Sequence, residues 1–145
     1  MIAMALASAL LAAATATVTD AAKAPTVWPA RDVPWTDAPA VKGAKVALLW
    51  GDPKKEANGT FKKFPPGTEV PPHTHTHEQR TVVVVGTLRM RVADAPARDL
   101  TPGSFALVPG GVVHAATCAP ESECIVYEEL PGPADFIPAK AEEKK

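Results

Sequence analysis

Short apolar runs alternate with glycine- and proline-rich turns through the middle of this chain. The turns fall at residues 51–53, 65–67, 86–87, 101–103 and 109–111. Strands are therefore expected at residues 45–50, 60–64, 69–75, 80–85, 88–92, 104–108, 112–117 and 123–130. Several short strands at this spacing are typical of an antiparallel sandwich or barrel. The pattern predicts one all-β domain over residues 45–130.

The segments next to this domain have a different composition. Residues 23–44 are rich in Pro and Ala and contain Trp28 and Trp35, which predicts an extended arm whose indoles dock on the barrel or on a partner subunit. For the start of this arm, a flexible linker is an open alternative. The C-terminal tail, residues 131–145, has little to bury beyond Phe136 and Ile137, and its last residues are expected to be disordered.

Residues 1–22 consist mostly of Ala, Leu, Met, Thr and Val and contain no Lys or Arg. They resemble the apolar region of a secretory signal peptide with Ala14-Thr15-Ala16 as its cleavage site, although the usual positive start is missing. The alternative is an Ala-rich amphipathic or disordered N-terminus. The run is too short and too rich in Ala and Thr for a membrane span. We therefore expect a periplasmic or secreted protein with no stable membrane insertion after removal of the signal.

Charge and proline content narrow the classes of protein further. The chain has 15 Lys and Arg against 16 Asp and Glu, a net charge of −1, and its lysine pairs are scattered. This distribution excludes the concentrated basic surface of a nucleic-acid-binding protein. The 16 prolines among 145 residues argue against long helices.

The histidines are the candidate chemical centre. Alternate residues of a strand share one face, so His73 and His75 can bring two imidazoles to one point inside a barrel. Imidazole is the commonest metal ligand in proteins, and His114, which follows the turn 109–111, is expected to complete a metal site from the adjacent strand. His77 is expected near a turn, where it is either solvated or hydrogen-bonded to a ligand residue.

Two segments around these histidines resemble the two motifs of the cupin superfamily. The first motif is a glycine, five residues, His-x-His, three or four residues, a glutamate, six residues and a glycine. It is matched by Gly67, His73, His75 and Gly86, while Gln79 stands at the glutamate position. The second motif is a glycine, five residues, Pro-x-Gly, two residues, His, three residues and an asparagine. It is matched by Gly103, Pro109, Gly111 and His114, while Cys118 stands at the asparagine position.

The resemblance implies a cupin jelly-roll β-barrel, often a homodimer, with one divalent transition metal such as Fe, Mn, Ni or Zn. The implied ligands are His73, His75, His114 and Gln79. Because Gln79 offers only a neutral oxygen, the ion would keep its double positive charge and attract a small anionic ligand. Glu78 could reach the ion only if a bulge shifted the strand by one residue, since alternation along the strand points it away; otherwise it is expected, like His77, among the residues that surround the ligands.

Cys118 has three open interpretations. It lies four residues after His114, so it shares that residue's face of the strand and could be a fourth metal ligand. Residues 118–124 are also consistent with a hairpin loop whose ends, Cys118 and Cys124, lie close enough for a disulfide. Export to an oxidising compartment would favour this disulfide. The third interpretation is a reduced thiol packed as a small apolar group.

The leading functional hypothesis is an exported cupin that acts as a non-haem metal dioxygenase on a small organic anion, because some cupins use three histidines for oxygen chemistry. The alternative is a non-catalytic metal- or small-molecule-binding or sensor module. The three intact histidines disfavour a degenerate structural cupin. Arg89, Arg91 and Tyr127 are the candidate substrate-binding residues; the arginines would bind a carboxylate if they point inward and would be solvated if they point outward.

Overall fold

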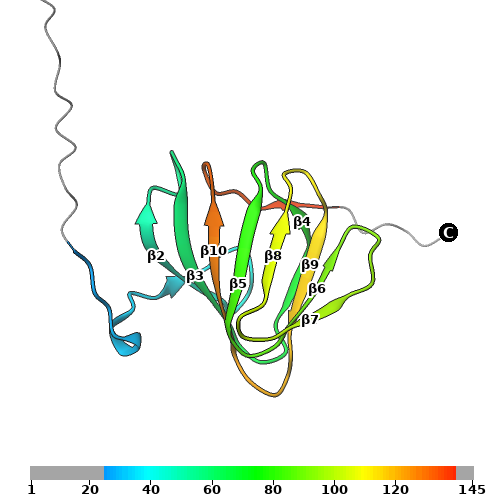
Figure 1. Cartoon of the computed structure of the whole chain (residues 1–145), viewed down its shortest axis with the longest axis horizontal. Helices are drawn as coiled ribbons and strands as arrows, with labels where there is room; N and C mark the ends of the chain where they lie inside the picture. The colour runs from blue at the N-terminus through cyan, green and yellow to red at the C-terminus, as the bar shows by residue number, and fades with distance from the viewer. Residues whose placement is uncertain (1–24, 140–145) are drawn as a thin grey trace, which may run out of the picture.

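The protein is described by a computed structural model over residues 25–139. Two antiparallel β-sheets face each other and form a barrel (Figure 1). The all-β antiparallel jelly roll predicted from the sequence is therefore confirmed. Over residues 25–139, no helix has the length and apolar character needed to cross a membrane.

Each strand run expected from the sequence overlaps an observed strand. The larger sheet contains, in spatial order, β1 (Thr36–Asp37), β2 (Lys45–Gly51), β3 (Asn58–Phe64), β10 (Cys124–Leu130), β5 (Gln79–Val85) and β8 (Phe105–Val108). The smaller sheet contains β11 (Ile137–Pro138), β4 (Glu69–Thr74), β9 (His114–Cys118), β6 (Leu88–Val92) and β7 (Arg98–Leu100). A 3₁₀ turn, η1 (Ala30–Asp32), precedes β1. Strands β1, β7 and β11 were not predicted because two or three residues are too few to show an alternating pattern.

The larger sheet presents polar side chains to the barrel interior. Phe61 of β3 and Tyr127 of β10 pair across the two strands on the outer face, where their rings meet edge to face. Because alternate residues of a strand face opposite sides, Lys62 and Glu128 point inward and line the interior. One inner wall of the barrel therefore carries charge.

The apolar core lies around a disulfide at the end of the barrel where the loop between β9 and β10 projects (Figure 1). Cys118 and Cys124 form this disulfide, with a Cα–Cα distance of 5.7 Å and 0% exposure of either residue. The structure thus contains the predicted disulfide, and the interpretations of Cys118 as a metal ligand or a reduced thiol are wrong. Four residues of strand, about 13 Å, separate Cys118 from His114 on β9.

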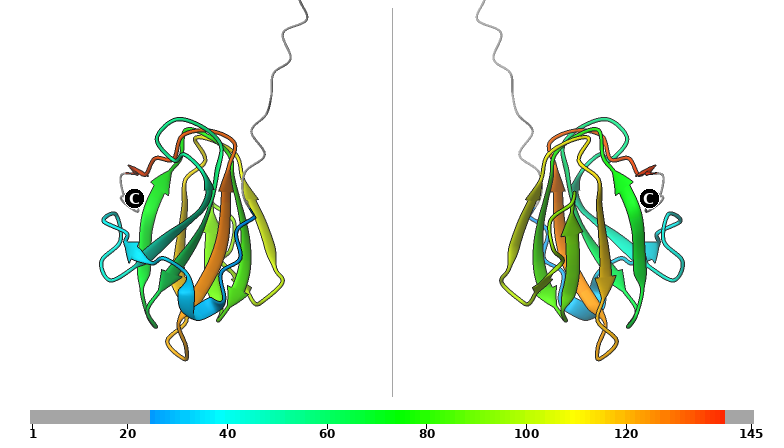
Figure 2. Two further views of the ribbon diagram at one scale, coloured as in Figure 1. Left: turned by 90° about the vertical axis from the view of Figure 1, so that its left-hand side faces the viewer. Right: turned by 90° about the vertical axis from the view of Figure 1, so that its right-hand side faces the viewer.

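Segments before β2 and after β10 complete the barrel. Trp35 stacks on Phe61 with ring centroids 6.4 Å apart, whereas Trp28 is 41% exposed. The C-terminal segment runs across the barrel end opposite the β9–β10 loop (Figure 2), where β11 pairs with β4. The expectation that the tail has little to bury missed this role of residues 131–139. The predicted signal segment, 1–22, and the end of the tail, 140–145, lie outside the described residues.

Candidate metal centre

The three predicted histidines meet inside the barrel. His73 belongs to β4, His75 lies just beyond that strand, and His114 begins β9. Strands β4 and β9 pair antiparallel with His73 directly opposite His114. One ring nitrogen from each histidine lies within 4.8 Å of the others.

The turn before β9 fixes the backbone around this cluster. Gly111 has a φ of +77°, a conformation that favours glycine, and its N–H donates to the His75 carbonyl oxygen at 2.8 Å. A Cβ atom on Gly110 would lie 2.4 Å from the carbonyl oxygen of Thr76, so this position also has no room for a side chain. The Pro-x-Gly turn therefore packs directly on the chain that carries His75.

Hydrogen bonds determine which ring nitrogen of each imidazole is available to bind a metal ion. The Nδ1 atom of His73 bonds to the Pro71 carbonyl oxygen at 2.8 Å, that of His75 to the Asp135 carbonyl oxygen at 2.5 Å, and that of His114 to the Val112 carbonyl oxygen at 3.1 Å. A carbonyl oxygen can only accept, so each Nδ1 carries the proton and each Nε2 keeps a free lone pair. All three rings are thus held in the form that binds a metal through Nε2.

Burial favours the neutral form of two of these rings, His73 and His114. His73, His75 and His114 are 4%, 4% and 3% exposed. Burial lowers the pKa of His73 to about 4, and the neighbouring His114 and His75 oppose its protonation further. Burial also lowers the pKa of His114. Because only neutral imidazole binds a metal, His73 and His114 are in their metal-binding form at neutral pH.

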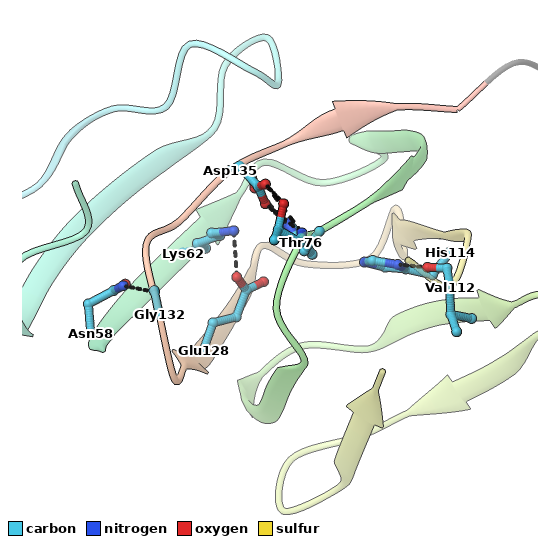
Figure 3. A network of polar contacts seen from close by, with 9 residues as sticks. Asn58, Lys62, Thr76, Val112, His114, Glu128, Gly132 and Asp135 are labelled. Atoms are coloured by element: carbon cyan, nitrogen blue, oxygen red, sulfur yellow. Dashed lines mark hydrogen bonds and ion pairs between the residues drawn. The ribbon is translucent and has the colours of Figure 1, made fainter. Parts of the chain in front are cut away.

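The segment after β10 holds two of the histidines. The Phe136 ring stacks on His73, with centroids 4.1 Å apart and an interplanar angle of 14°. The carboxylate of Asp135 accepts hydrogen bonds from the backbone N–H and the hydroxyl of Thr76 (Figure 3), and its main chain accepts the His75 bond. Residues 135 and 136 therefore cover and orient the cluster.

Gln79, at the glutamate position of the first motif, is 4% exposed on β5. Its side chain lies beside Glu128 and contributes to lowering the pKa of that carboxyl group. A carboxylate can only accept, so the NH₂ group faces Glu128. The Gln79 carbonyl oxygen is buried and has no hydrogen-bond partner among the described residues. It is free to accept a proton donor or to bind a cation.

A cavity of about 170 Å³ lies against His73 and His114. Most of its wall is apolar and comes from both sheets and the arm; the main contributors are Val41, Phe64, Val70, Leu88 and Met90. Its polar lining includes Lys62, Gln79, Thr81 and Glu128. A second cavity, of about 300 Å³, lies against His75, and Lys62 lines both cavities. The space beside the histidines therefore suits a small molecule that is mostly apolar.

The donor atoms fit a divalent transition metal. The Nε2 atoms of His75 and His114 are buried and have no hydrogen-bond partner within residues 25–139, a costly state unless another group binds them. Three neutral imidazoles suit Zn, Fe, Ni or Mn ions with open coordination positions. The cluster could thus hold a metal ion through His73, His75 and His114, with the Gln79 oxygen as a further donor.

His77 and Glu78 lie outside the cluster. His77 packs against the backbone of Gly132, where an added Cβ would lie 2.3 Å from its Nε2 atom. Glu78 forms an ion pair with Arg80, which also binds Glu129. Strand parity thus keeps Glu78 away from the histidines, as expected in the absence of a bulge.

The three candidate substrate-binding residues do not line the cavity. Arg89 and Arg91 are exposed, and Arg89 forms two hydrogen bonds with Asp99 at 2.7 and 2.9 Å. Their alternate neighbour Met90 is the residue of β6 that points inward. Tyr127 lies on the outer face, where its hydroxyl accepts a hydrogen bond from Trp50 Nε1 at 3.0 Å. Each of the three lies one residue out of phase with the inner face, and the arginines have the outward orientation that the sequence left open.

Lys62, Glu128 and Asp135 are the charged residues beside the site that sequence reasoning missed. In β3 and β10 the aromatic Phe61 and Tyr127 suggest the wrong inner face. The alternation of residues along β10 could have shown the inner face. Cys124, Val126 and Leu130 are buried, and Glu128 lies on the same face because it is an even number of positions from each of them.

Comparison with known proteins agrees with this geometry. The chain is similar to an RmlC-like cupin from Shewanella frigidimarina, with 27% identity and a TM-score of 0.62 over 77% of this chain and 93% of that one. It is similar to KdgF from Halomonas sp., with 21% identity and a TM-score of 0.59 over 74% of this chain and 94% of that one. It is also similar to the polyketide cyclase RemF from Streptomyces resistomycificus, with 20% identity and a TM-score of 0.66 over 82% of this chain and 89% of that one. No curated protein matches the chain.

A family model described as "Domain of unknown function (DUF4437)" matches residues 26–143. This match spans the arm, the barrel and the C-terminal segment. The chain is therefore a cupin-fold protein that belongs to the DUF4437 family.

Proposed function

We propose that this protein is a metal-dependent cupin that binds a small organic anion with an apolar body and acts on it as a dioxygenase. The observation that carries the proposal is the convergence of three buried imidazoles, each oriented by an Nδ1 hydrogen bond, two of which line an apolar cavity. Dioxygenase chemistry is favoured by the resemblance to cupins that use three histidines. The polyketide cyclase RemF has a similar fold, so a reaction without oxygen is the competing outcome.

A bound divalent ion would supply a Lewis-acid centre that attracts an anionic group of the substrate. The chain's own residues prepare the site for that group. The carbonyl acceptors on Nδ1 hold the histidine rings in one orientation. Val70, Leu88 and Met90 surround the apolar body of the substrate and exclude water. Among the described residues, the carboxylates that line the cavity are Glu128 and Asp135, and Asp135 is bonded to Thr76. Glu128 is in turn paired with Lys62, so both of these carboxylates already have partners.

The experiment loads the purified protein with Fe(II), Mn(II), Ni(II) or Zn(II) and measures oxygen consumption with a panel of small organic acids, phenols and thiols. Turnover with oxygen uptake by a redox-active metal form, and none by the Zn(II) form, is the expected result. Substrate conversion without oxygen uptake would reject the dioxygenase in favour of a cyclase- or lyase-type reaction.

A non-catalytic sensor is the second candidate, and Gln79 is the observation that favours it. An amide cannot accept a proton near neutral pH, so the residue in the usual glutamate position cannot act as a base. Tight binding of an organic anion to the metal form without conversion by any metal would favour this candidate.

We also propose that the protein works outside the cytoplasm. The buried disulfide between Cys118 and Cys124 supports this location, since such bonds persist in oxidising compartments. Mass spectrometry of the native protein should find a start near Thr17 and the disulfide intact. Retention of Met1 would reject export.

A further inference from the structure

An ion pair lies inside the barrel, next to the candidate metal centre and outside both cupin motifs. Lys62 Nζ is 2.5 Å from Glu128 Oε2 (Figure 3), and the two side chains are 27% and 7% exposed. They come from neighbouring strands, β3 and β10, and both line the cavity that contains His73 and His114. The pair is therefore close enough to influence whatever binds there.

Glu128 is connected to the site through Gln79. On the inner face, Glu128 pairs across the sheet with Thr81, two residues from Gln79 on the same strand. Gln79 and Glu128 both line the cavity, and among the described residues the buried Gln79 carbonyl oxygen has no hydrogen-bond partner. The carboxylate of Glu128 thus lies next to Gln79, the residue at the glutamate position of the first motif.

Stability of the fold alone does not account for the pair. Removing two charges from water is costly, and apolar residues of similar volume often stabilise a protein as well or better. The Lys62 ammonium group lies 2.5 Å from Glu128 Oε2, so each side chain compensates the charge of the other inside the barrel.

We propose that Lys62 and Glu128 belong to the metal site as a charge-balanced pair, in which Glu128 orients Gln79, the residue at the motif glutamate position, and Lys62 offsets the charge of Glu128. Glu128 is a positioning residue: it fixes the Gln79 amide so that the carbonyl oxygen is free for the ion. Lys62 cancels the charge of Glu128 and so preserves the ion's attraction for an anionic substrate. This inference rests on the proposed function, because it requires a metal at the three histidines.

Opposite effects of two single substitutions distinguish this role from a structural one. Glu128→Gln leaves Lys62 unpaired and adds one positive charge, so Co(II) affinity should fall on the order of tenfold and azide affinity of the Co(II) form should rise. Lys62→Met leaves Glu128 unpaired and adds one negative charge, so Co(II) affinity should rise by a similar factor and azide affinity should fall. A loss of packing alone would weaken Co(II) binding in both variants.

The double variant Lys62→Met/Glu128→Gln is the matched control, because it removes both charges and keeps the size of the side chains. Its Co(II) affinity should return to within about threefold of that of the unaltered protein. Competition titration at fixed pH gives the Co(II) affinities, the Co(II) absorption spectrum reports azide binding, and thermal unfolding of each variant verifies that it is folded. If a single variant does not fold, the double variant and Glu128→Asp, which keeps the charge and shortens its reach to Gln79, replace it in the comparison.

The possible outcomes separate the two proposals. Co(II) binding by the unaltered protein with shifts of the same sign in both single variants, or with no shifts, overturns this inference and leaves the proposed function intact. Failure of the unaltered protein to bind Co(II) overturns the proposed function and this inference with it. The expected result is that the two single variants shift Co(II) affinity in opposite directions and that the double variant returns it close to that of the unaltered protein.

Discussion

The metal-free protein should lose stability as the pH falls from 7 to 5, and His73 should be the main cause. Its pKa is 6.5 in an ordinary environment and about 4 in the folded barrel, chiefly because burial disfavours the charged ring. Between these values the unfolded chain binds a proton that the folded chain does not, so acid favours unfolding. Above pH 6.5 both states are neutral, and the full stability is present.

The size of the effect follows from this difference. At about 1.4 kcal/mol per pKa unit, a pKa that drops from 6.5 to about 4 corresponds to on the order of 3 kcal/mol once the pH is below 4. By pH 5 the loss should be about 2 kcal/mol. The lowered pKa of His114 adds to the loss in the same direction.

Urea unfolding of the chelator-treated protein at several pH values between 7 and 5 measures this loss. His73→Asn is the matched variant, since it removes the titrating ring and keeps a polar side chain; its free energy of unfolding should change less over the same pH interval. An equal pH dependence in the two proteins, or a gain of stability on acidification, would refute the reasoning from burial. Measurements stay above pH 5 so that Glu128 and Asp135, whose pKa values are below normal, remain ionised.

Three further predictions concern Gln79, Phe136 and the disulfide. Gln79→Glu should raise Co(II) affinity by adding an anionic ligand and lower azide affinity of the metal form; equal azide affinities in the two proteins would contradict the charge argument. Phe136→Ala should cost about 2 kcal/mol of stability in thermal unfolding, because a half-buried ring that stacks on His73 is lost, whereas an unchanged melting temperature would mean that this segment does not hold the site. Reduction of the Cys118–Cys124 bond should lower the urea midpoint by an amount equivalent to about 2 kcal/mol without removing the metal, and loss of metal on reduction would show that the two ends of the barrel are coupled.

The cluster could be predicted from the sequence because its signals are local. His73 and His75 share a strand face by spacing alone, and the turn that places His114 contains glycines that its geometry requires. The segments that carry these histidines also belong to a regular alternation of short apolar runs and turns, so the barrel itself could be predicted from the sequence. The same parity rule placed Glu78 outside the site.

The charged inner wall could not be predicted in this way. Phe61 and Tyr127 form an aromatic outer face with Trp35 and Trp50. Lys62 and Glu128 therefore line the interior, against the usual preference of charged residues for solvent and of aromatic residues for the core. The cover formed by Phe136 depends on the tertiary position of a two-residue strand, which no periodic pattern can reveal.

Metal content after His114→Ala tests the central claim most directly. The unaltered protein should bind about one divalent ion per chain, and His114→Ala should abolish binding, since two histidines from one strand cannot complete the site. His77→Ala is the matched control and should keep its metal, because His77 packs on Gly132 outside the cluster. Undiminished metal in His114→Ala, measured by elemental analysis after dialysis, would contradict the assignment of this cluster as a metal centre.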